Sequence, residues 1–423
     1  MSKQLNEHLQ ANNLHAITQS AYRKFHSTET AMVRVMNDLL RAVDKHNEAA
    51  LVLLDLSAAF DTIDQELLLQ RLSERFGIHG IVLAFFRSYL TGRSQFVNIN
   101  NTDSDKHMLF CGVPQGSVLG PQLFTMYISP VEDIINAHGL EKMQYADDTQ
   151  IYTIFKKSET TTVLSRLEQC IDDVKAWMIQ NKLKLNDSKT ELIHVTSQFI
   201  NSAQLPPVTI GTSLIEPSPE ARDLGILVDD KLSLNNHVTN ICRTATYAIW
   251  KISQIRKYLD NAQTERLVHA FITSHLDNCN SLLYGLPCAQ IDKLQRIQNT
   301  AARLITRTKK YDHISGVLEQ LHWLPIHKRI IYKILLLTYK AVNGQSPEYI
   351  AELVSFYNPP RSLRSSSQRQ LVSPRFSTSY AKRAFSVAAP TLWNKLPIHI
   401  RQAHSLNSFK SQLKSHLFIS NVI

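Results

Sequence analysis

The sequence predicts an α+β fold in its first half, followed by an all-α, basic second half. Strand patterns alternate with amphipathic helices as far as about residue 235, and the continuous apolar run of "EAALVLLDL" is typical of a strand buried on both faces. From His237 onward the pattern is almost wholly helical. Charge follows the same division, because the net charge of +10 is the sum of −7 over residues 1–235 and +17 over residues 236–423.

Composition narrows the class of protein. The chain has 423 residues, enough for two or three domains with their own cores, and its 43% hydrophobic and 19% charged content is that of a globular protein. Five cysteines without close spacing form neither a disulfide framework nor a zinc pattern, so we expect free thiols in a reducing compartment. The polar N-terminus and the lack of an apolar run near ~20 residues predict an intracellular protein of cytoplasm or nucleus, without signal peptide, transmembrane segment or membrane partner.

The elements of the first half follow in order. The first long helix, "STETAMVRVMNDLLRAV", places Met32, Met36 and Leu40 on one face. After the buried strand come helices at about 64–76 and 79–90, and then a hairpin formed by "SQFVNIN" and "KHMLFC". "GVPQGSVLGPQLF" is a loop that runs into a helix, which Pro130 must bend or break.

The second set of elements begins at "QYADDTQIY", which is predicted to be strand, turn and strand. A long amphipathic helix around Leu164–Met178 comes next, followed by the strands "KTELIHV" and "DLGILVD". The basic half contains a helix at 289–307 with lysine and arginine on its outer positions. A segment rich in serine and arginine, residues 358–383, is predicted to be an exposed linker.

Three aspartates are candidate metal ligands. Asp147 and Asp148 are adjacent carboxylates between two strands, a pattern that suits either a turn or a cation site. Asp55 ends an apolar strand, where an ionised group is costly unless something compensates it or the strand end is solvated. Together they suggest two neighbouring strands that deliver carboxylates to one edge of a sheet. Magnesium suits such a site, and phosphoryl transfer on two metal ions requires carboxylates gathered in this way.

At this point several motifs, in order, resemble those of reverse transcriptases of the non-LTR (LINE-type) retrotransposons. The three core motifs are "LVLLDLSAAFDTID", "GVPQGSVLGPQLF" and "QYADDTQIY". "QSAYRKFHSTETA" resembles the fingers motif of that family, "LNDSKTELI" its lysine-bearing motif and "ARDLGILVDDKLSL" its primer-grip region. The resemblance covers about residues 5–235 and implies a right-hand polymerase with palm and fingers around an antiparallel sheet, followed by a basic, thumb-like helical region.

The resemblance assigns the acidic and basic residues of the catalytic site. Asp55 and Asp147 would hold two Mg²⁺ ions, for which Mn²⁺ is a possible substitute, and Asp148 would assist. Lys189 matches the family's candidate general acid for the departing pyrophosphate, although a lysine in a polar loop is often only solvated. The fingers motif is too degenerate to assign a role to Arg23 or Lys24.

Three further residues match positions that contact substrate. Phe60 is similar to the aromatic gate that excludes the 2′-OH of a ribonucleotide, and its alternative role is core packing. Gln115 and Gly116 stand where the family contacts the incoming nucleotide and the template strand. Glycine permits close backbone approach, although any tight turn also favours it.

The resemblance also implies a domain order, from which the chain departs in three respects. No upstream fingers segment, endonuclease domain or cysteine–histidine knuckle is found, so we expect an N-terminally truncated copy of an element's polymerase region. The predicted segments are partial fingers at 1–48, palm with the remaining fingers elements at 49–195, a primer-grip-like segment at 196–235, a helical thumb-like region at 236–310 and a basic C-terminal helical region at 311–423.

The expected function is RNA-directed DNA synthesis in retrotransposition, adding dNTPs to a primer 3′ end on an RNA template with a DNA primer. One alternative is a catalytically inactive remnant that only binds nucleic acid, because the basic half suits a polyanion whether or not the palm turns over. Another is a maturase-like or telomerase-like relative. The sequence does not predict the oligomeric state.

Overall fold

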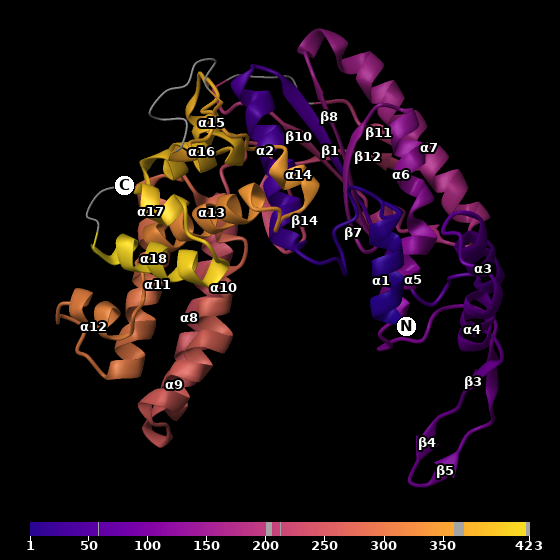
Figure 1. The fold of residues 1–423 in the computed structure, drawn as a ribbon, viewed down its shortest axis with the longest axis horizontal. Coiled ribbons are helices and arrows are strands. Elements are labelled where there is room, and N and C mark those ends of the chain that lie inside the picture. Colours follow the sequence, from indigo (N-terminus) through magenta and orange to yellow (C-terminus); the bar gives the residue numbers. More distant parts are fainter. Residues whose placement is uncertain (58, 200–204, 212, 359–367, 420–423) are drawn as a thin grey trace. The chain divides into compact units, whose positions relative to one another are not determined.

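The computed structural model describes residues 1–57, 59–199, 205–211, 213–358 and 368–419 (Figure 1). The chain forms two compact units, each assembled from segments that are separate in sequence. The first unit contains a mixed sheet and its covering helices, and the second is mainly helical, which confirms the predicted fold class. The first unit comprises Met1–Ser27, Ala49–His194 and Ser202–Ser218, and the second comprises Thr28–Glu48, Val195–Asn201 and Pro219–Ile423.

A five-stranded sheet forms the centre of the first unit, in the order β13-β10-β1-β8-β7. Strand β1 is buried at every position after Glu48, as its continuous apolar run predicted. The β7–β8 pair is antiparallel, as predicted, and the β10–β13 pair is parallel, so the sheet is mixed. The strands are β1 (Glu48–Leu54), β7 (Glu141–Tyr145), β8 (Asp148–Phe155), β10 (Glu191–Val195) and β13 (Pro217–Ser218).

Helices cover this sheet. Helix α7 buries Leu167, Ile171 and Val174, which lie on one helical face, and it runs beside α6 (Figure 1). Pro130 begins α6 just after α5 ends, because proline cannot continue the preceding hydrogen-bond ladder. The helices of this unit are α1 (Ser2–Ala11), α3 (Gln65–Glu74), α4 (Gly80–Leu90), α5 (Gly120–Ile128), α6 (Pro130–Ala137) and α7 (Thr160–Gln180), with 3₁₀ turns η1 (Lys157–Glu159) and η2 (Asp187–Lys189).

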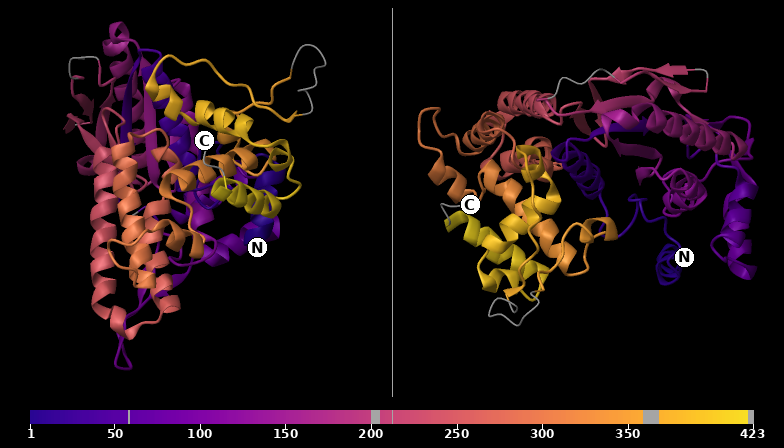
Figure 2. Two further views of the ribbon diagram at one scale, coloured as in Figure 1. Left: turned by 90° about the vertical axis from the view of Figure 1, so that its left-hand side faces the viewer. Right: turned by 90° about the horizontal axis from the view of Figure 1, so that it is seen from above.

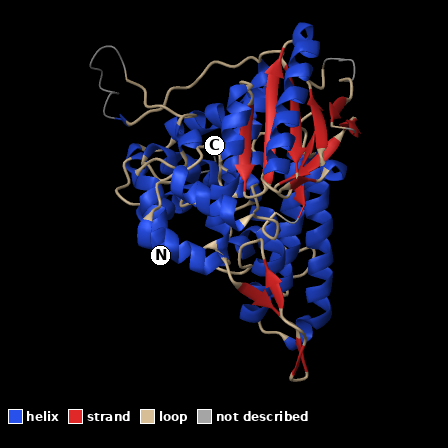
Figure 3. Cartoon of the chain, turned by 90° about the vertical axis from the view of Figure 1, so that its right-hand side faces the viewer, coloured by secondary structure: helices blue, strands red, loops and turns tan. Residues whose placement is uncertain are grey.

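The predicted hairpin projects from the first unit as two short ladders (Figure 3). Asn100 and Asn101 both have positive φ at its tip, which suits the primed turns that match strand twist. The ladders are β3 (Arg93–Gln95) with β6 (His107–Leu109) and β4 (Asn98–Ile99) with β5 (Thr102–Asp103), and the other short pairs are β2 (Leu56–Ser57) with β9 (Lys184–Leu185) and β11 (Val208–Ile210) with β12 (Ser213–Ile215).

Helix α2 (Thr28–Asp44) belongs to the second unit, although residues 1–48 were expected to form one fingers segment. It is buried on several faces rather than on one stripe, because helices α15, α16 and the turn η5 all pack against it. The strand predicted over "DLGILVD" is instead the hairpin of β14 (Glu220–Asp223) and β15 (Ile226–Asp229). Leu224 and Gly225 have positive φ and form its turn.

Long helices dominate the rest of the second unit. Helix α11 packs along α8, with Leu294 and Ala301 of α11 and Val238 and Ala245 of α8 buried (Figure 2). The elements are α8 (Asn235–Ile255), η3 (Arg256–Tyr258), α9 (Asn261–Val268), the π-helical turn η4 (His269–Thr273), α10 (Ser274–Asp277), η5 (Asn280–Leu283), α11 (Cys288–Thr306), α12 (Ser315–Gln320), α13 (Ile326–Val342), α14 (Glu348–Ala351), α15 (Ser379–Arg383), α16 (Phe385–Lys395), α17 (Ile398–Arg401) and α18 (Leu406–Ile419).

The prediction of an exposed linker at 358–383 is wrong for the second half of this segment. Residues 359–367 lie outside the described residues, but Leu371 is buried, forms a β-bridge with Phe356 and donates its backbone N–H to Asn394 Oδ1 at 2.8 Å. Tyr380 in helix α15 is buried as well. The serine and arginine content concealed these apolar anchors, so the second half of the segment is packed structure.

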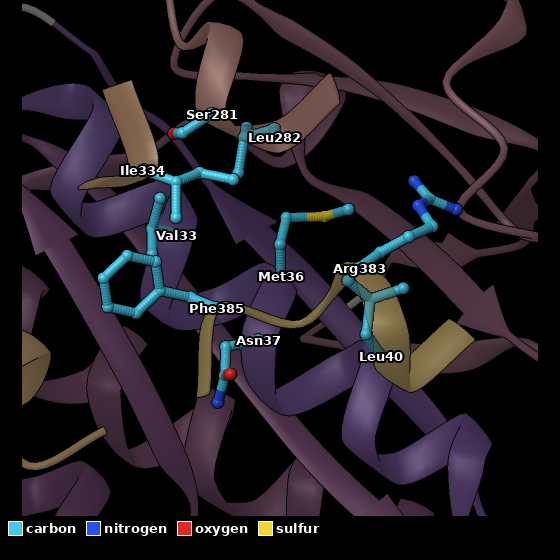
Figure 4. Close-up of a pocket in the computed structure, with 9 residues that line it drawn as sticks. All are labelled: Val33, Met36, Asn37, Leu40, Ser281, Leu282, Ile334, Arg383 and Phe385. Carbon is cyan, nitrogen blue, oxygen red and sulfur yellow. The ribbon is translucent and has the colours of Figure 1, made fainter. Parts of the chain in front are cut away.

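A small pocket in the core of the second unit lies between α2, η5, α13 and α16 (Figure 4). Apolar side chains such as Val33, Leu40 and Phe385 line it. The Arg383 guanidinium is directed away from them in Figure 4 and donates to the Leu232 carbonyl oxygen at 2.7 Å. The pocket is therefore a gap in core packing.

Among the described residues, no helix is both long and apolar enough to cross a membrane.

Candidate active site

The two adjacent aspartates lie at the turn between β7 and β8. Tyr145 pairs with Asp148, so Ala146 and Asp147 form a two-residue hairpin connection. Ala146 has φ +57°, in the left-handed region that glycine adopts more readily than alanine. The predicted strand–turn–strand arrangement is confirmed, and the turn is tight because no other residues separate the two strands.

Asp55 follows β1 directly, and local pairing brings Lys189 to it. Strand β2 pairs with β9, and the backbone N–H of Asn186 donates to the Asp55 carbonyl oxygen at 2.9 Å. The 3₁₀ turn η2 then places the Lys189 ammonium 3.1 Å from Asp55 Oδ2. The Asp55 side chain is 28% exposed, so this ion pair is partly shielded from water. The structure therefore brings together two candidates that lie 134 residues apart.

The three carboxylates interact electrostatically. Burial, followed by the charges of Asp147 and Asp55, raises the pKa of Asp148 to about 6. The pKa of Asp147 is also raised, mainly by burial, with a further contribution from Asp55. Lys189 opposes both shifts. Asp55, Asp147 and Asp148 therefore lie close enough for their charges to act on one another.

The donor set fits a hard divalent cation in its chemistry. Carboxylate oxygens are the ligands that Mg²⁺ prefers, and a cation would relieve the repulsion that raises the two pKa values. Among the described residues, however, no cluster of three or more His, Cys, Asp or Glu side chains forms a ready-made metal site. Since Mg²⁺ is commonly held by one or two carboxylates together with substrate phosphates, the residues present suit an ion that arrives with substrate.

Magnesium affinity should depend on pH through Asp148. Its pKa near 6 means that the proton must leave before the carboxylate binds Mg²⁺, so apparent affinity should rise as pH increases to about 6 and level off above it. Calorimetry with MgCl₂ at pH 6 in two buffers should detect the released proton, at about half a proton per chain. Asp148→Asn should reduce this release, whereas Asp105→Asn, at an exposed hairpin aspartate, should retain it in full. Equal release from both variants would assign the titration to another group.

A second group of predicted residues lies on the loop before α5. The Val113 backbone N–H donates to the Phe60 carbonyl oxygen at 3.1 Å, and Gly112 donates to the Ile63 carbonyl oxygen at 2.7 Å. A Cβ at position 112 would stand 2.9 Å from the Asp61 carbonyl oxygen, so only glycine permits this close approach. The structure thus places Phe60 beside the loop that carries Gln115 and Gly116.

Phe60, Gln115 and Gly116 differ in how they are held. The half-buried Phe60 ring stacks on Phe124, with centroids 4.7 Å apart, and packs against the core. Gln115 is exposed, and its side-chain amide donates to Asp61 Oδ1 at 2.6 Å. Gly116 has φ +73°, and no described atom lies within 4 Å of the Cβ that another residue would carry. The loop at Gly116 therefore faces open space.

Sequence reasoning missed two residues that support these groups. Asp61 holds Gln115, but nothing distinguishes it in the sequence from the neighbouring aspartates. Gln19 in the fingers motif is 3% exposed, and its side chain bonds to both backbone groups of Ala146. Arg23, which the sequence left unassigned, donates to the carbonyl oxygens of Ala16 and Gln19. Long-range bonds of this kind have no periodic signal in a sequence.

The second unit presents cations and aromatic rings together. On α8, Tyr247 and Trp250 are exposed and stacked, with centroids 5.9 Å apart, and the Lys251 ammonium lies 4.5 Å from the Tyr247 ring centroid. Exposed aromatic rings beside cations are the combination that single-stranded nucleic acid recognises. We refer to the exposed cations of α8, η3 and α11 and its C-cap as the α8/α11 cations; they are Arg243, Lys251, Lys257, Lys293, Arg296 and Arg307.

Comparison with known proteins identifies the family. Residues 1–228, more than half of the chain, match the model of the family described as reverse transcriptase (RNA-dependent DNA polymerase). The probable RNA-directed DNA polymerase from transposon BS of Drosophila melanogaster is 26% identical over 306 residues, which cover 69% of this chain and 33% of that protein. The RNA-directed DNA polymerase from mobile element jockey of Drosophila funebris is 26% identical over 240 residues, which cover 56% of this chain and 25% of that protein. The chain thus spans about a quarter to a third of the length of these relatives.

Solved structures similar to the chain include apo telomerase from Candida tropicalis, with a TM-score of 0.42 and 11% identity over 82% of this chain and 60% of that one. Another is telomerase from Candida albicans in complex with a TWJ fragment of telomeric RNA, with a TM-score of 0.38 and 12% identity. That match covers 78% of this chain and 53% of the telomerase chain. The family model and the curated relatives confirm the resemblance inferred from the motifs. The chain belongs to the reverse transcriptase family and is related to the RNA-directed DNA polymerases of non-LTR retrotransposons.

Proposed function

We propose that the chain carries out RNA-directed DNA synthesis, adding dNTPs to a DNA primer on an RNA template during retrotransposition. The observation that supports this most strongly is the gathering of Asp55, Asp147 and Asp148 beside Lys189, with the pKa of Asp148 raised to about 6. Nucleotidyl transfer needs several carboxylates from separate parts of the fold at one point. Here the end of β1 supplies Asp55, the β7–β8 turn supplies Asp147 and Asp148, and the 3₁₀ turn η2 adds Lys189.

Asp55 and Asp147 would hold two Mg²⁺ ions, or Mn²⁺ in their place, with Asp148 assisting. When bound, such ions supply Lewis-acid stabilisation of the phosphoryl oxygens. Lys189 is the proposed general acid, and its ion pair with Asp55 is the contact that it makes in the absence of substrate. The side chain is 64% exposed, so it is free to turn from Asp55 toward a departing pyrophosphate.

Gln115, Gly116 and Phe60 are proposed to bind the incoming nucleotide and the template. Asp61 orients the Gln115 amide, and the open space beside Gly116 allows a nucleic-acid strand to approach the backbone. Phe60 is fixed on one side by the Phe124 ring, while its partial exposure leaves part of the ring available to a sugar. A ring held in this way excludes a 2′-OH by its bulk.

Replacing Phe60 with Val should raise incorporation of rNTP relative to dNTP by about tenfold or more, because a clash with the 2′-OH is removed. The ratio of kcat/KM values for dCTP and CTP measures this directly. Phe60→Tyr is the matched control, since it keeps an aromatic ring of similar bulk stacked on Phe124. An unchanged ratio in an active Phe60→Val protein would show that Phe60 is a core residue only.

The second candidate function is nucleic-acid binding without catalysis. It is favoured by the charge of +17 after residue 235 and by the aromatic and cationic surface of α8, neither of which requires an active palm. The palm, primer-grip and thumb boundaries, and an intracellular location, are proposals on either view, whereas the fingers boundary at residue 48 is not kept because α2 belongs to the second unit.

Primer extension separates the two functions. Purified chain is incubated with an RNA template, a labelled DNA primer, dNTPs and Mg²⁺ or Mn²⁺, and product length is measured with and without EDTA. Polymerase function predicts EDTA-sensitive extension to the template end. Tight RNA binding without extension under both metals would favour the binding function.

A further inference from the structure

The turn that carries Asp147 and Asp148 is held by a side chain from the fingers motif. Gln19 Nε2 donates to the Ala146 carbonyl oxygen at 3.1 Å, and the Ala146 backbone N–H donates to Gln19 Oε1 at 2.9 Å. The same Oε1 accepts the backbone N–H of Ala21 at 3.0 Å. One carboxamide therefore satisfies both backbone groups of the turn residue, which is itself buried.

The segment that carries Gln19 is itself fixed. Residues 18–20 run parallel to β7. The Ser20 N–H donates to the Gln144 carbonyl oxygen at 2.8 Å, and the Gln144 N–H donates to the Thr18 carbonyl oxygen at 3.1 Å. Thr18 donates to Glu132 of α6 through both its backbone N–H and its hydroxyl. Arg23 closes the loop by donating to the Gln19 carbonyl oxygen at 2.9 Å. Gln19 therefore extends from a rigid support.

Ala146 needs such support because of its backbone conformation. In a two-residue hairpin turn a positive φ is normally supplied by glycine or asparagine, and alanine pays a steric penalty there. Strained residues persist only where their surroundings over-determine them. The direction of the next two residues depends on this peptide, so a relaxed Ala146 would re-aim both carboxylates.

We propose that Gln19 is a positioning residue, whose carboxamide holds Ala146 in the left-handed conformation and thereby sets the orientation of Asp147 and Asp148. The proposal rests on the polymerase function proposed above. In this proposal the fingers motif holds the catalytic turn in place through Gln19. This role is separate from any contact with template or triphosphate.

Gln19→Leu keeps most of the side-chain volume and removes all three hydrogen bonds. We expect kcat for primer extension to fall about 10²-fold, as for small misplacements of reacting groups, while the Kd for RNA stays unchanged. In the free protein, the amide of Ala146 should lose protection from hydrogen exchange, because its acceptor is gone. Gln144→Leu is the matched control: Gln144 is fully buried in the same hairpin, but within the described part of the chain its side chain has only a 3.5 Å bond to Thr149.

A second variant distinguishes positioning from simple core filling. Ala146→Gly lets the turn adopt positive φ without strain, so adding it to Gln19→Leu should raise kcat at least tenfold above that of Gln19→Leu alone. Wild-type exchange at Ala146 in Gln19→Leu, or a loss of kcat that Ala146→Gly leaves unrepaired, would overturn the proposal. If the wild-type chain extends no primer, the polymerase function fails, and the exchange measurement still decides whether Gln19 holds the turn.

Discussion

Asp147→Asn should abolish primer extension, with kcat falling at least about 10³-fold, while RNA affinity stays within twofold. The substitution removes a negative ligand from the proposed metal site without changing side-chain volume, and metal-assisted stabilisation is worth several kcal/mol, or a factor of ten for each ~1.4 kcal/mol. Single-turnover extension measures the chemical step, and filter binding measures RNA affinity.

The fold should survive this change. Asp147 has a raised pKa, so its charge is unfavourable in the metal-free chain, and a neutral amide should leave the free energy of unfolding unchanged or higher at pH 7. Asp105→Asn serves as the control, because that exposed aspartate lies on the hairpin of β3 to β6. Extension by Asp147→Asn at more than a tenth of the wild-type rate would remove Asp147 from the catalytic residues.

Replacing all six α8/α11 cations with glutamine should greatly weaken RNA binding and its salt dependence. Each neutralised phosphate on a single strand contributes about −0.7 to the log–log slope of affinity against salt, so six contacts give a slope near −4 and a loss of roughly 10²–10³-fold between 50 and 200 mM salt. The variant should bind more weakly even at 50 mM salt, with a much smaller slope. Fluorescence anisotropy with a labelled single-stranded RNA measures both quantities.

The matched control changes the same number of exposed cations in the first unit, whose sequence region is net acidic. We expect this second variant to retain most of the wild-type slope, because the +17 half supplies the long-range field. Equal losses in the two variants would mean that the α8/α11 cations are not the main nucleic-acid surface. The control positions are Lys3, Lys106, Lys157, Arg166, Lys182 and Lys184.

Several parts of the site were predictable because short segments determine them. Asp55 lies at the end of the most apolar strand, and the Asp147–Asp148 pair lies where the two predicted strands, β7 and β8, are joined by a turn. The break at Pro130 follows from the missing backbone donor. Each of these features depends on a few adjacent residues, which sequence patterns report well.

Other parts depend on contacts between distant segments. The amphipathic pattern of α2 did not show that it packs in the second unit, and the Leu224–Gly225 turn lacks the usual Asn-Gly or Asp-Gly signal. The bond from Gln19 to Ala146 spans 127 residues. Pairings of this kind are set by the tertiary fold, so a single sequence gives no local sign of them.

The central claim is that Asp55 and Asp147 share a divalent ion, and anomalous scattering from Mn²⁺ tests it most directly. Crystals of the chain with an RNA template, a DNA primer and an unreactive dNTP analogue would be grown in MnCl₂. We expect one anomalous peak within about 2.1 Å of a carboxylate oxygen of each aspartate, and a second about 3.5–4 Å away. Side chains of Asp55 and Asp147 on opposite faces of the sheet, with no ion between them, would contradict the account.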